Sequence, residues 1–260
     1  MNDLLKIAII QTDIIWEDSR ANLEKFQKLL TGMTLHPDLI VFPEMFTTGF
    51  SINPERNAQE MTGEGILWMK KIAGELNSSL AGSMIIKDNN DYFNRFVFVT
   101  PDGNIQHYDK RHLFRMGNEE SSYQTGVERK IFRSGNWRIC PQICYDLRFP
   151  VWSRNRNDYD LLIYVANWPE PRCDIWKTLL KARAIENLSY CIGVNRVGTD
   201  GRGISYAGES MVIDGKGRIL SDLKVHSEDI IYTEISLSDL RKLRDDFPAH
   251  KDADSFQLER

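Results

Sequence analysis

Short apolar runs recur along the chain, and most of them have the length and composition of β-strands. They are rich in Ile, Val, Leu, Phe and Tyr, and polar or turn-forming residues bound them. The predicted strands are 5–10, 38–42, 79–86, 94–99, 137–143, 161–166, 190–195, 210–214 and 230–235. Glycines in "TPDGNI" (100–105) and "IDGKGRI" (213–219) predict tight turns after two of these strands.

Four longer segments space their apolar residues as amphipathic helices do. They are 19–30, 64–76, 174–187 and 236–248, with Asp174 as the expected N-cap of the third. Leu67 and Ile72 are expected to face the core from the second helix, and Trp176, Leu180 and Ile185 from the third.

The order of strands and helices predicts an α/β protein, with a mixed sheet and helices outside it. Because no Pro/Gly/Ser-rich linker divides the chain, residues 1–260 are expected to form a single domain. The formal charge of −4 and the lack of a long basic run argue against a nucleic-acid partner. No run of eighteen apolar residues predicts a membrane span, and the first strand is too short for a signal peptide, so the expected location is the cytoplasm.

Cysteine spacing argues against disulfides and metal sites. Cys140 lies in the predicted strand 137–143 and Cys144 directly follows it, so along one extended run they are about 13 Å apart, which is too far for a disulfide. No C-x-x-C or H-E-x-x-H motif occurs, so neither a metal nor another cofactor is expected. All four cysteines, including Cys173 and Cys191, are therefore expected to be reduced, and most of them to be structural.

Several predicted strands run into polar residues that a core does not need. Glu44, Cys144, Asn167 and Asn195 each follow such a strand, the last with Arg196 beside it. In open α/β sheets, ligands bind beyond the carboxyl ends of the strands, so these side chains are expected to converge.

Glu44, Lys110 and Cys144 together have the chemistry of acyl transfer. A carboxylate can take the proton of a thiol, and an ammonium group can hold a developing oxyanion. The ammonium group is also expected to lower the pKa of Cys144 below its free value of about 8.5. A Cys–His dyad using His107 or His112 is the competing arrangement.

Three separated motifs resemble the carbon–nitrogen hydrolase, or nitrilase, superfamily, and in particular its omega-amidase branch. The motifs are "FPEMFTTGF" (42–50), "YDKRHLF" (108–114) and "CYDLRFPVWSRN" (144–155), and the likeness continues through "YVANWP" (164–169), "KARAIEN" (181–187) and "SMVIDGKGRIL" (210–220). The resemblance implies a four-layer αββα sandwich, a small-molecule amide substrate and a homodimer. For the homodimer, Trp176 and Leu180 face either a partner or the chain's own core.

The resemblance also implies a role for each matched residue. Glu44 corresponds to the general base, Lys110 to the oxyanion-stabilising lysine and Cys144 to the nucleophile. Glu119 is the best match to a second glutamate, although Glu120 is adjacent. The residues expected to contact substrate are Tyr145 (through its N–H), Phe114, Asn167 and Trp168, the last of which either walls the pocket or fills core.

The residues around these motifs are expected to play supporting parts. Asp146 and Arg148 are expected to brace the turn after Cys144, and "GTDGRG" (198–203) is expected to form a flexible rim loop. A cation must face the carboxylate of an omega-amide substrate, and the sequence leaves four candidates open. They are Arg115, Arg148, Arg196 and Arg202.

The function that the resemblance to omega-amidases implies is hydrolysis of the terminal amide of a short 2-oxo dicarboxylate, such as 2-oxoglutaramate, to a carboxylate and ammonia. An N-carbamoyl or nitrile hydrolase would use the same three groups. A non-catalytic binding or redox-sensing protein is the alternative from another class.

Overall fold

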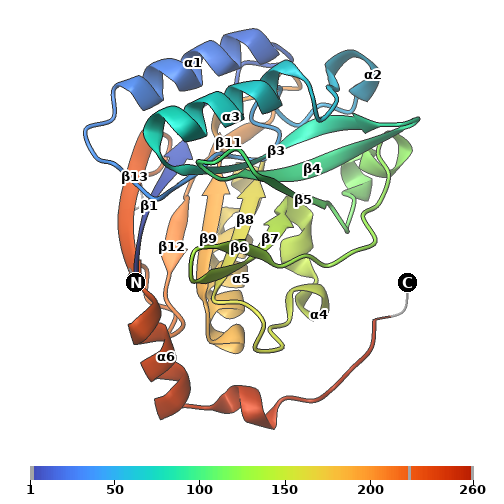
Figure 1. Cartoon of the computed structure of the whole chain (residues 1–260). Coiled ribbons are helices and arrows are strands. Elements are labelled where there is room, and N and C mark those ends of the chain that lie inside the picture. Colours follow the sequence, from blue (N-terminus) through green and yellow to red (C-terminus); the bar gives the residue numbers. More distant parts are fainter. Residues whose placement is uncertain (1–2, 222–223, 259–260) are drawn as a thin grey trace.

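The computed structural model describes residues 3–221 and 224–258, which fold around two β-sheets packed face to face (Figure 1). Within these residues the first sheet has six strands in the order β13-β1-β2-β3-β4-β5. Its strands are β13 (Asp229–Ser236), β1 (Leu4–Gln11), β2 (Leu39–Val41), β3 (Ser79–Asp88), β4 (Asp91–Val99) and β5 (Ile105–Asp109). The second sheet has five strands in the order β12-β9-β8-β7-β6. Its strands are β12 (Met211–Ile213), β9 (Tyr190–Asn195), β8 (Leu161–Ala166), β7 (Trp137–Ile143) and β6 (Phe132–Ser134).

Helices cover the outer face of each sheet, which completes an αββα sandwich. Helices α1 (Ser19–Thr31) and α3 (Glu64–Leu76) pack on the first sheet, and α5 (Cys173–Asn187) packs on the second (Figure 1). The remaining helices are α2 (Pro54–Asn57), α4 (Pro150–Ser153) and α6 (Leu237–Asp246). The four-layer architecture predicted from the family resemblance is confirmed.

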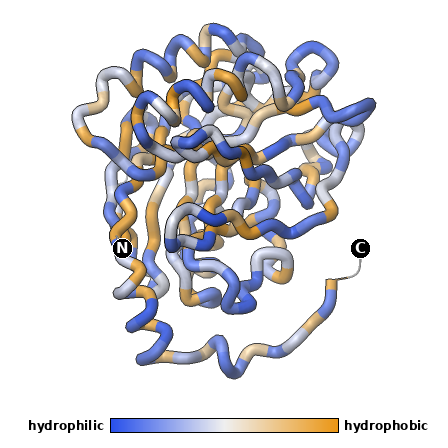
Figure 2. The backbone as a smooth tube through the Cα atoms, in the orientation of Figure 1, coloured by the Kyte–Doolittle hydropathy of each residue, from blue (hydrophilic) through white to orange (hydrophobic). Residues whose placement is uncertain are grey.

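Alternation along each strand divides the core into layers. In β1, Ile7 and Ile9 belong to the cluster between the sheets, whereas Ala8 and Ile10 pack against α1 and α3. This follows from the strand geometry, in which successive side chains point to opposite faces. Figure 2 shows the same pattern, with hydrophobic residues along the central strands and more hydrophilic residues on the outer helices and loops. Each fully buried large apolar side chain contributes roughly 1.5–3 kcal/mol of stability.

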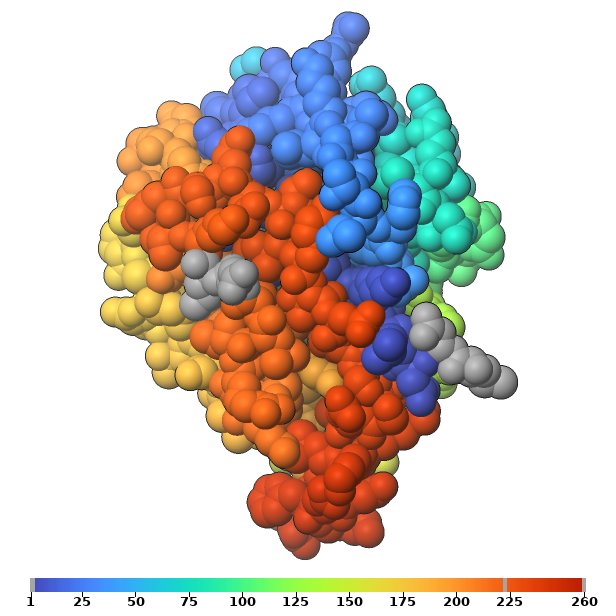
Figure 3. All heavy atoms as spheres, turned by 90° about the vertical axis from the view of Figure 1, so that its left-hand side faces the viewer, coloured from blue at the N-terminus to red at the C-terminus, as the bar shows by residue number. Residues whose placement is uncertain are grey.

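The parallel strands at the centre of each sheet determine where a site can form. Strands β1, β2 and β3 run parallel, as do β7, β8 and β9. Their carboxyl ends therefore lie along one edge of each sheet, where parallel sheets commonly bind ligands. The last strand, β13, returns to pair with β1, and Figure 3 shows this red segment beside the blue N-terminal one.

All nine predicted strands and all four predicted long helices are present, but several details were wrong. The segment 198–203, predicted as a flexible rim loop, is a loop only in part: Gly198 and Thr199 belong to β10 (Val197–Thr199), and residues 200–203 lie in the turn that leads to β11 (Ser205–Ala207). Both strands are only three residues long, too short for an alternation pattern. The turn at 213–219 makes one isolated bridge rather than a full hairpin. Strands β5 and β6 and the short helices α2 and α4 had no predicted counterpart.

The helical faces were also predicted only in part. Leu67 and Ile185 are exposed, although both were expected to face the core. Asp174 lies inside the first turn of α5 rather than at its N-cap, which is Arg172. Trp176 and Leu180 are fully buried in the chain's own core, so they are not available to a partner chain. Within residues 3–221 and 224–258, no helix is both long and apolar enough to cross a membrane.

Candidate active site

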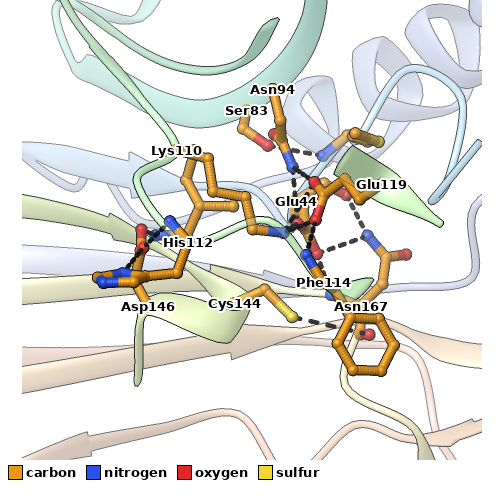
Figure 4. Close-up of polar contacts among 12 residues, drawn as sticks. Glu44, Ser83, Asn94, Lys110, His112, Phe114, Glu119, Cys144, Asp146 and Asn167 are labelled. Carbon is orange, nitrogen blue, oxygen red and sulfur yellow. Dashed lines mark hydrogen bonds and ion pairs between the residues drawn. The ribbon is translucent and has the colours of Figure 1, made fainter. Parts of the chain in front are cut away.

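Polar side chains from both sheets meet at the carboxyl edge of the parallel strands (Figure 4). Glu44 follows β2 and Lys110 follows β5, so both come from the first sheet. Cys144 and Asn167 follow β7 and β8 in the second sheet. Glu119 comes from the 3₁₀ turn Glu119–Ser121 in the long connection between β5 and β6. The convergence predicted from the strand exits is therefore present.

Glu44 is fully buried, and both oxygens of its carboxylate accept hydrogen bonds. Its Oε1 accepts hydrogen bonds from Lys110 Nζ at 2.9 Å and from Asn94 Nδ2 at 2.8 Å. Its Oε2 accepts the backbone N–H of Asn167 at 2.8 Å, and the Asn167 side chain donates to the Glu44 carbonyl at 2.7 Å. These contacts tie the two sheets together and fix the orientation of the carboxylate.

Lys110 is also fully buried and lies between two carboxylates. Its Nζ is 2.9 Å from Glu44 Oε1 and 2.9 Å from each carboxylate oxygen of Glu119. Burial works against its charge, but Glu119 and Glu44 outweigh burial and raise the pKa of Lys110. The lysine therefore stays an ammonium group at neutral pH.

Glu119, rather than Glu120, is the second glutamate of the site. Besides Lys110, it accepts the backbone N–H of Phe114 at 2.7 Å and Asn94 Nδ2 at 3.2 Å. Burial and the neighbouring Glu44 raise the pKa of Glu119, and Lys110 opposes them. Glu120 is exposed. Two carboxylates and one ammonium give this buried cluster a formal charge of −1 when all three are ionised.

Cys144 occupies a strained elbow between β7 and the 3₁₀ turn Cys144–Arg148. Its φ is +43°, in the left-handed region that residues with a side chain seldom adopt. Asp146 holds the elbow by accepting the N–H of Ile143 at 3.0 Å and the hydroxyl of Tyr108 at 2.8 Å. The thiol lies 4.0 Å from the Asn167 carbonyl oxygen and lines a cavity.

Asp146 also engages His112, which argues against a Cys–His dyad. The Asp146 carboxylate lies 2.8 Å from His112 Nδ1 and accepts the His112 backbone N–H at 2.9 Å. The imidazole stacks on Phe149 with ring centroids 3.8 Å apart. His107 lies in β5, paired with Val97. The predicted bracing role of Asp146 is confirmed by these contacts, and the histidine next to Lys110 supports the same turn.

The expected direction of the Cys144 pKa shift was wrong. Burial raises the pKa of Cys144 well above the ordinary thiol value, Glu44 adds to the increase and Lys110 opposes it. The ammonium group cannot dominate because burial of the thiol and two nearby carboxylates both oppose it. At rest Cys144 is therefore a thiol with a carboxylate beside it, not a preformed thiolate.

The cavity above Cys144 has a volume of about 160 Å³. All four residues predicted to contact substrate line it, and Trp168 is nearly buried as well, so it both walls the pocket and packs in the core. The lining residues are Phe50, Phe114, Met116, Gly117, Cys144, Tyr145, Arg148, Asn167, Trp168, Pro169, Arg172, Arg202, Ile204 and Tyr206.

Of the four candidate arginines, two line the cavity and two do not. Arg148 and Arg202 line the cavity, so Arg148 faces the pocket instead of bracing the turn as predicted. Arg196 is fully buried and ion-paired with Asp13, and exposed Arg115 does not line the cavity. Asn195 supports the pocket wall indirectly, by accepting the backbone N–H of Trp168.

Asn94 and Arg172 are polar residues at the site that were missed from the sequence. Asn94 alternates with Phe96 and Phe98 in β4 and so points between the sheets, where an amide has no reason to be unless it has partners. That signal was available. Arg172 was harder to predict from the sequence, because it lies in the short 3₁₀ turn Glu170–Arg172, which carries no periodic pattern. In the part of the chain that the structure describes, no group of three or more His, Cys, Asp or Glu could hold a metal ion.

The fold and this buried Glu–Lys–Cys arrangement define a hydrolase of carbon–nitrogen bonds other than peptide bonds, and the comparisons agree. The chain belongs to the carbon–nitrogen hydrolase family, whose sequence model matches residues 6–245. It is 48% identical over 255 residues to the omega-amidase YafV of Escherichia coli strain K12, with 98% of each chain covered.

Two further comparisons extend this similarity. The chain is 33% identical over 251 residues to a 2-oxoglutaramate amidase of Bacillus subtilis strain 168, covering 95% of this chain and 96% of that protein. The solved structure of XC1258 from Xanthomonas campestris is a superfamily member with an arsenic adduct in its active site. It superposes with a TM-score of 0.96 at 43% identity, covering all of both chains.

Proposed function

We propose that this protein is an omega-amidase that hydrolyses the terminal amide of small 2-oxo dicarboxylate monoamides through a thioester on Cys144. The observation that carries the proposal is the thiol at the floor of a small cavity, directly beside a buried Glu44–Lys110–Glu119 cluster. Relatives named omega-amidase and 2-oxoglutaramate amidase match this chain over nearly its whole length, which supports the substrate class.

In the first half-reaction, Cys144 Sγ attacks the amide carbonyl carbon while Glu44 takes the thiol proton. Because the thiol pKa is raised, proton removal has to accompany the attack, and a fixed carboxylate is suited to that task. The carbonyl oxygen becomes an oxyanion, which Lys110 Nζ and the backbone N–H of Tyr145 stabilise.

Collapse of the tetrahedral intermediate breaks the carbon–nitrogen bond. Protonated Glu44 donates its proton to the leaving nitrogen, so ammonia departs and a thioester remains on Cys144. Glu44 is then a carboxylate again and takes a proton from a water molecule, whose oxygen attacks the thioester carbon. The carbon–sulfur bond breaks, the acid leaves, and the proton on Glu44 returns to Cys144 Sγ. Glu119 positions both Lys110 and, through Asn94, Glu44.

Mass spectrometry of the intact protein tests this function most directly. Rapid quenching after mixing with succinamate should reveal a mass increase of one succinyl group, mapped to the peptide that contains Cys144. Ammonia release should be much faster from 2-oxoglutaramate and succinamate than from glutamine, asparagine, aliphatic nitriles or N-carbamoyl amino acids. A best rate on a nitrile or a carbamoyl substrate would move the protein to another branch, with the same nucleophile.

A redox-sensing role is the less favoured alternative. Sensor thiols have lowered pKa values and open access, whereas burial and Glu44 raise the pKa of Cys144. A binding protein also has no need for a buried carboxylate base beside its thiol.

Two finer expectations belong to this proposal. The protein is expected in the cytoplasm and as a homodimer, in which Trp176 and Leu180 take no part because both are buried. Light scattering should then give twice the 30.1 kDa of one chain. A mass equal to one chain would contradict the dimer and leave the chemistry untouched.

A further inference from the structure

Three arginines face the cavity above Cys144 without any acidic partner. Arg148, Arg172 and Arg202 all line it, and no Asp or Glu does. Among the described residues, no ion pair or side-chain hydrogen bond engages these three guanidinium groups. Elsewhere in the fold the well-buried arginines are paired with carboxylates, for example Arg95 with Asp109 and Arg196 with Asp13.

Two of these arginines are held on aromatic rings that belong to the site. The Arg172 guanidinium lies 5.5 Å above the Phe114 ring, and that of Arg148 lies 5.4 Å above the Trp168 ring. A guanidinium held over a ring by cation–π attraction uses none of its N–H groups for that contact, so they stay free for a carboxylate. The rings therefore position the donors without using them.

Both rings are anchored to the catalytic cluster, which fixes the arginines relative to the thiol. The backbone N–H of Phe114 donates to Glu119 at 2.7 Å. Trp168 follows Asn167, whose N–H binds Glu44, and the Trp168 indole donates to the Arg172 carbonyl oxygen at 2.8 Å. Arg172 is half-buried, whereas Arg148 and Arg202 are exposed, so water screens the Arg172 charge least.

Resting on the proposed function, we infer that Arg172 and Arg148 together bind the remote carboxylate of the substrate, with Arg172 the stronger contact. The bidentate fork of Arg172 accounts for recognition of a planar, two-oxygen group. Arg202, on the turn between β10 and β11, adds positive charge at the entrance rather than a fixed contact.

The same arrangement explains why an amino acid amide should be a poor substrate. The α-ammonium of glutamine would enter a cavity lined by three cations and no carboxylate. It would lose water without gaining a partner, which is strongly unfavourable. A 2-oxo group in the same place carries no charge. The cavity therefore selects deaminated monoamides by charge.

Steady-state ammonia release from Arg172→Gln and Arg148→Gln tests the inference, with succinamate as the charged substrate and butyramide as its neutral analogue. Arg172→Gln should raise the KM for succinamate about 10- to 100-fold with little change in kcat, because one charge-assisted pair is lost in ground and transition states alike. Arg148→Gln should have a smaller effect in the same direction. Arg172→Lys should restore part of the loss.

Butyramide and Arg115→Gln are the controls. The kcat/KM for butyramide should stay within about twofold in every variant, because this substrate has no carboxylate to lose. Arg115→Gln removes an exposed arginine outside the cavity and should leave all parameters unchanged. Arg172→Gln should also narrow the preference for succinamate over glutamine.

The outcomes separate this inference from the proposed function. If wild-type enzyme prefers succinamate to butyramide and the Arg148→Gln, Arg172→Gln double variant keeps that preference, the inferred carboxylate binding by the two arginines is wrong and the omega-amidase assignment stands. If wild-type enzyme shows no preference for succinamate or 2-oxoglutaramate over butyramide, the proposed function itself fails. A parallel loss on butyramide would show that the arginines support the fold or the chemistry instead of the carboxylate, and would overturn the inference.

Discussion

Strands β7 and β8 carry charged clusters at both ends, and the two ends use charge in opposite ways. At their amino ends, Arg138 and Arg244 converge on Asp160, at 2.7 Å and 2.9 Å from its Oδ1. Burial opposes ionisation of Asp160, but the arginines outweigh burial and lower its pKa. The carboxyl group there is held firmly in its charged form, which stabilises the fold.

At the carboxyl ends of the same strands, the balance is reversed. Burial and like charges raise the pKa values of Cys144 and Glu119, and the single cation Lys110 is shared by two carboxylates. Cys144 and Glu119 therefore hold their protons more strongly than free thiol and carboxyl groups do, at the end of the strands where a proton can be transferred. The carboxylates of both clusters are buried, but one cluster has two cations for one carboxylate and the other has one cation for two carboxylates. The comparison teaches that this ratio of cations to carboxylates, more than burial alone, decides whether a cluster stabilises the fold or keeps protons that can be transferred.

Removing the thiol of Cys144, the proposed nucleophile, should produce the largest effect of all. Cys144→Ala should lower kcat by at least about 10⁴-fold, since the remaining groups have nothing to activate. Ammonia release on 2-oxoglutaramate measures this, with circular dichroism to verify folding. Cys173→Ala, at a half-buried free thiol, is the matched control and should keep turnover within about twofold. Near wild-type turnover in Cys144→Ala would exclude the thioester mechanism.

Removing the base or the cation should come next. Glu44→Gln keeps the shape of the side chain but cannot take a proton, so kcat/KM should fall about 10³-fold. Lys110→Ala should lose a similar factor and also stability, because it leaves two buried carboxylates together. Thermal unfolding measured beside the kinetics separates the two losses for Lys110→Ala.

Replacing each of two adjacent glutamates in turn tests whether Glu119 or Glu120 is the second glutamate of the site. Glu119→Gln should lower kcat/KM about 10²-fold, because Lys110 loses one of its two carboxylates and Asn94 loses a charged acceptor. Glu120→Gln, one residue away and exposed, should change it by less than about twofold. Equal effects from both variants would contradict the geometry.

Breaking the stabilising end should cost folding free energy and leave catalysis intact. Asp160→Asn removes the shared partner of two arginines and should lower the free energy of unfolding by about 3 kcal/mol, measured with urea. Asp246→Asn breaks an exposed pair with Lys242 and should cost less than about 0.5 kcal/mol. The Asp160 pKa is lowered, so its contribution is present above the unfolded value of about 3.9 and disappears as the pH falls further.

The smallest expected effect is on thiol reactivity. Because the Cys144 pKa is raised, its alkylation by iodoacetamide should accelerate about tenfold per pH unit from pH 7 to 9 without reaching a plateau. Glu44→Gln removes a negative charge that raises this pKa, so it should speed alkylation at pH 7 while slowing turnover. A plateau below pH 8 in the wild-type protein would show that the thiolate is already formed.

The sequence predicted most of this molecule where its signals were local. Strand runs, long helices and polar strand exits identified Glu44, Cys144 and Asn167 because each follows directly from an apolar run. Lys110 and Glu119 depended on the family resemblance, since a charged loop has no pattern of its own. The direction of the Cys144 pKa shift was mispredicted because it depends first on burial of the thiol, and then on the two carboxylates that oppose one ammonium group. That arrangement exists only after both sheets have assembled.

The residues that line the cavity from outside the strands were the hardest to predict. Arg172 belongs to a three-residue turn and Arg202 to a hairpin tip, and neither segment is long enough to show periodicity. Arg148 and Asp146 lie two residues apart, yet one faces the pocket and the other the core. In a 3₁₀ turn such a division follows from packing, and spacing alone does not reveal it.

The left-handed backbone conformation at Cys144 places the stability of the fold and the presence of the thiol in conflict at one position. With φ at +43°, any side chain there strains the elbow by about 1–2 kcal/mol, whereas glycine would be relaxed. A lineage selected only for heat resistance would gain by losing this side chain, and would then have a robust scaffold that turns nothing over. A cysteine at this elbow therefore places a thiol at the cavity at the expense of backbone strain.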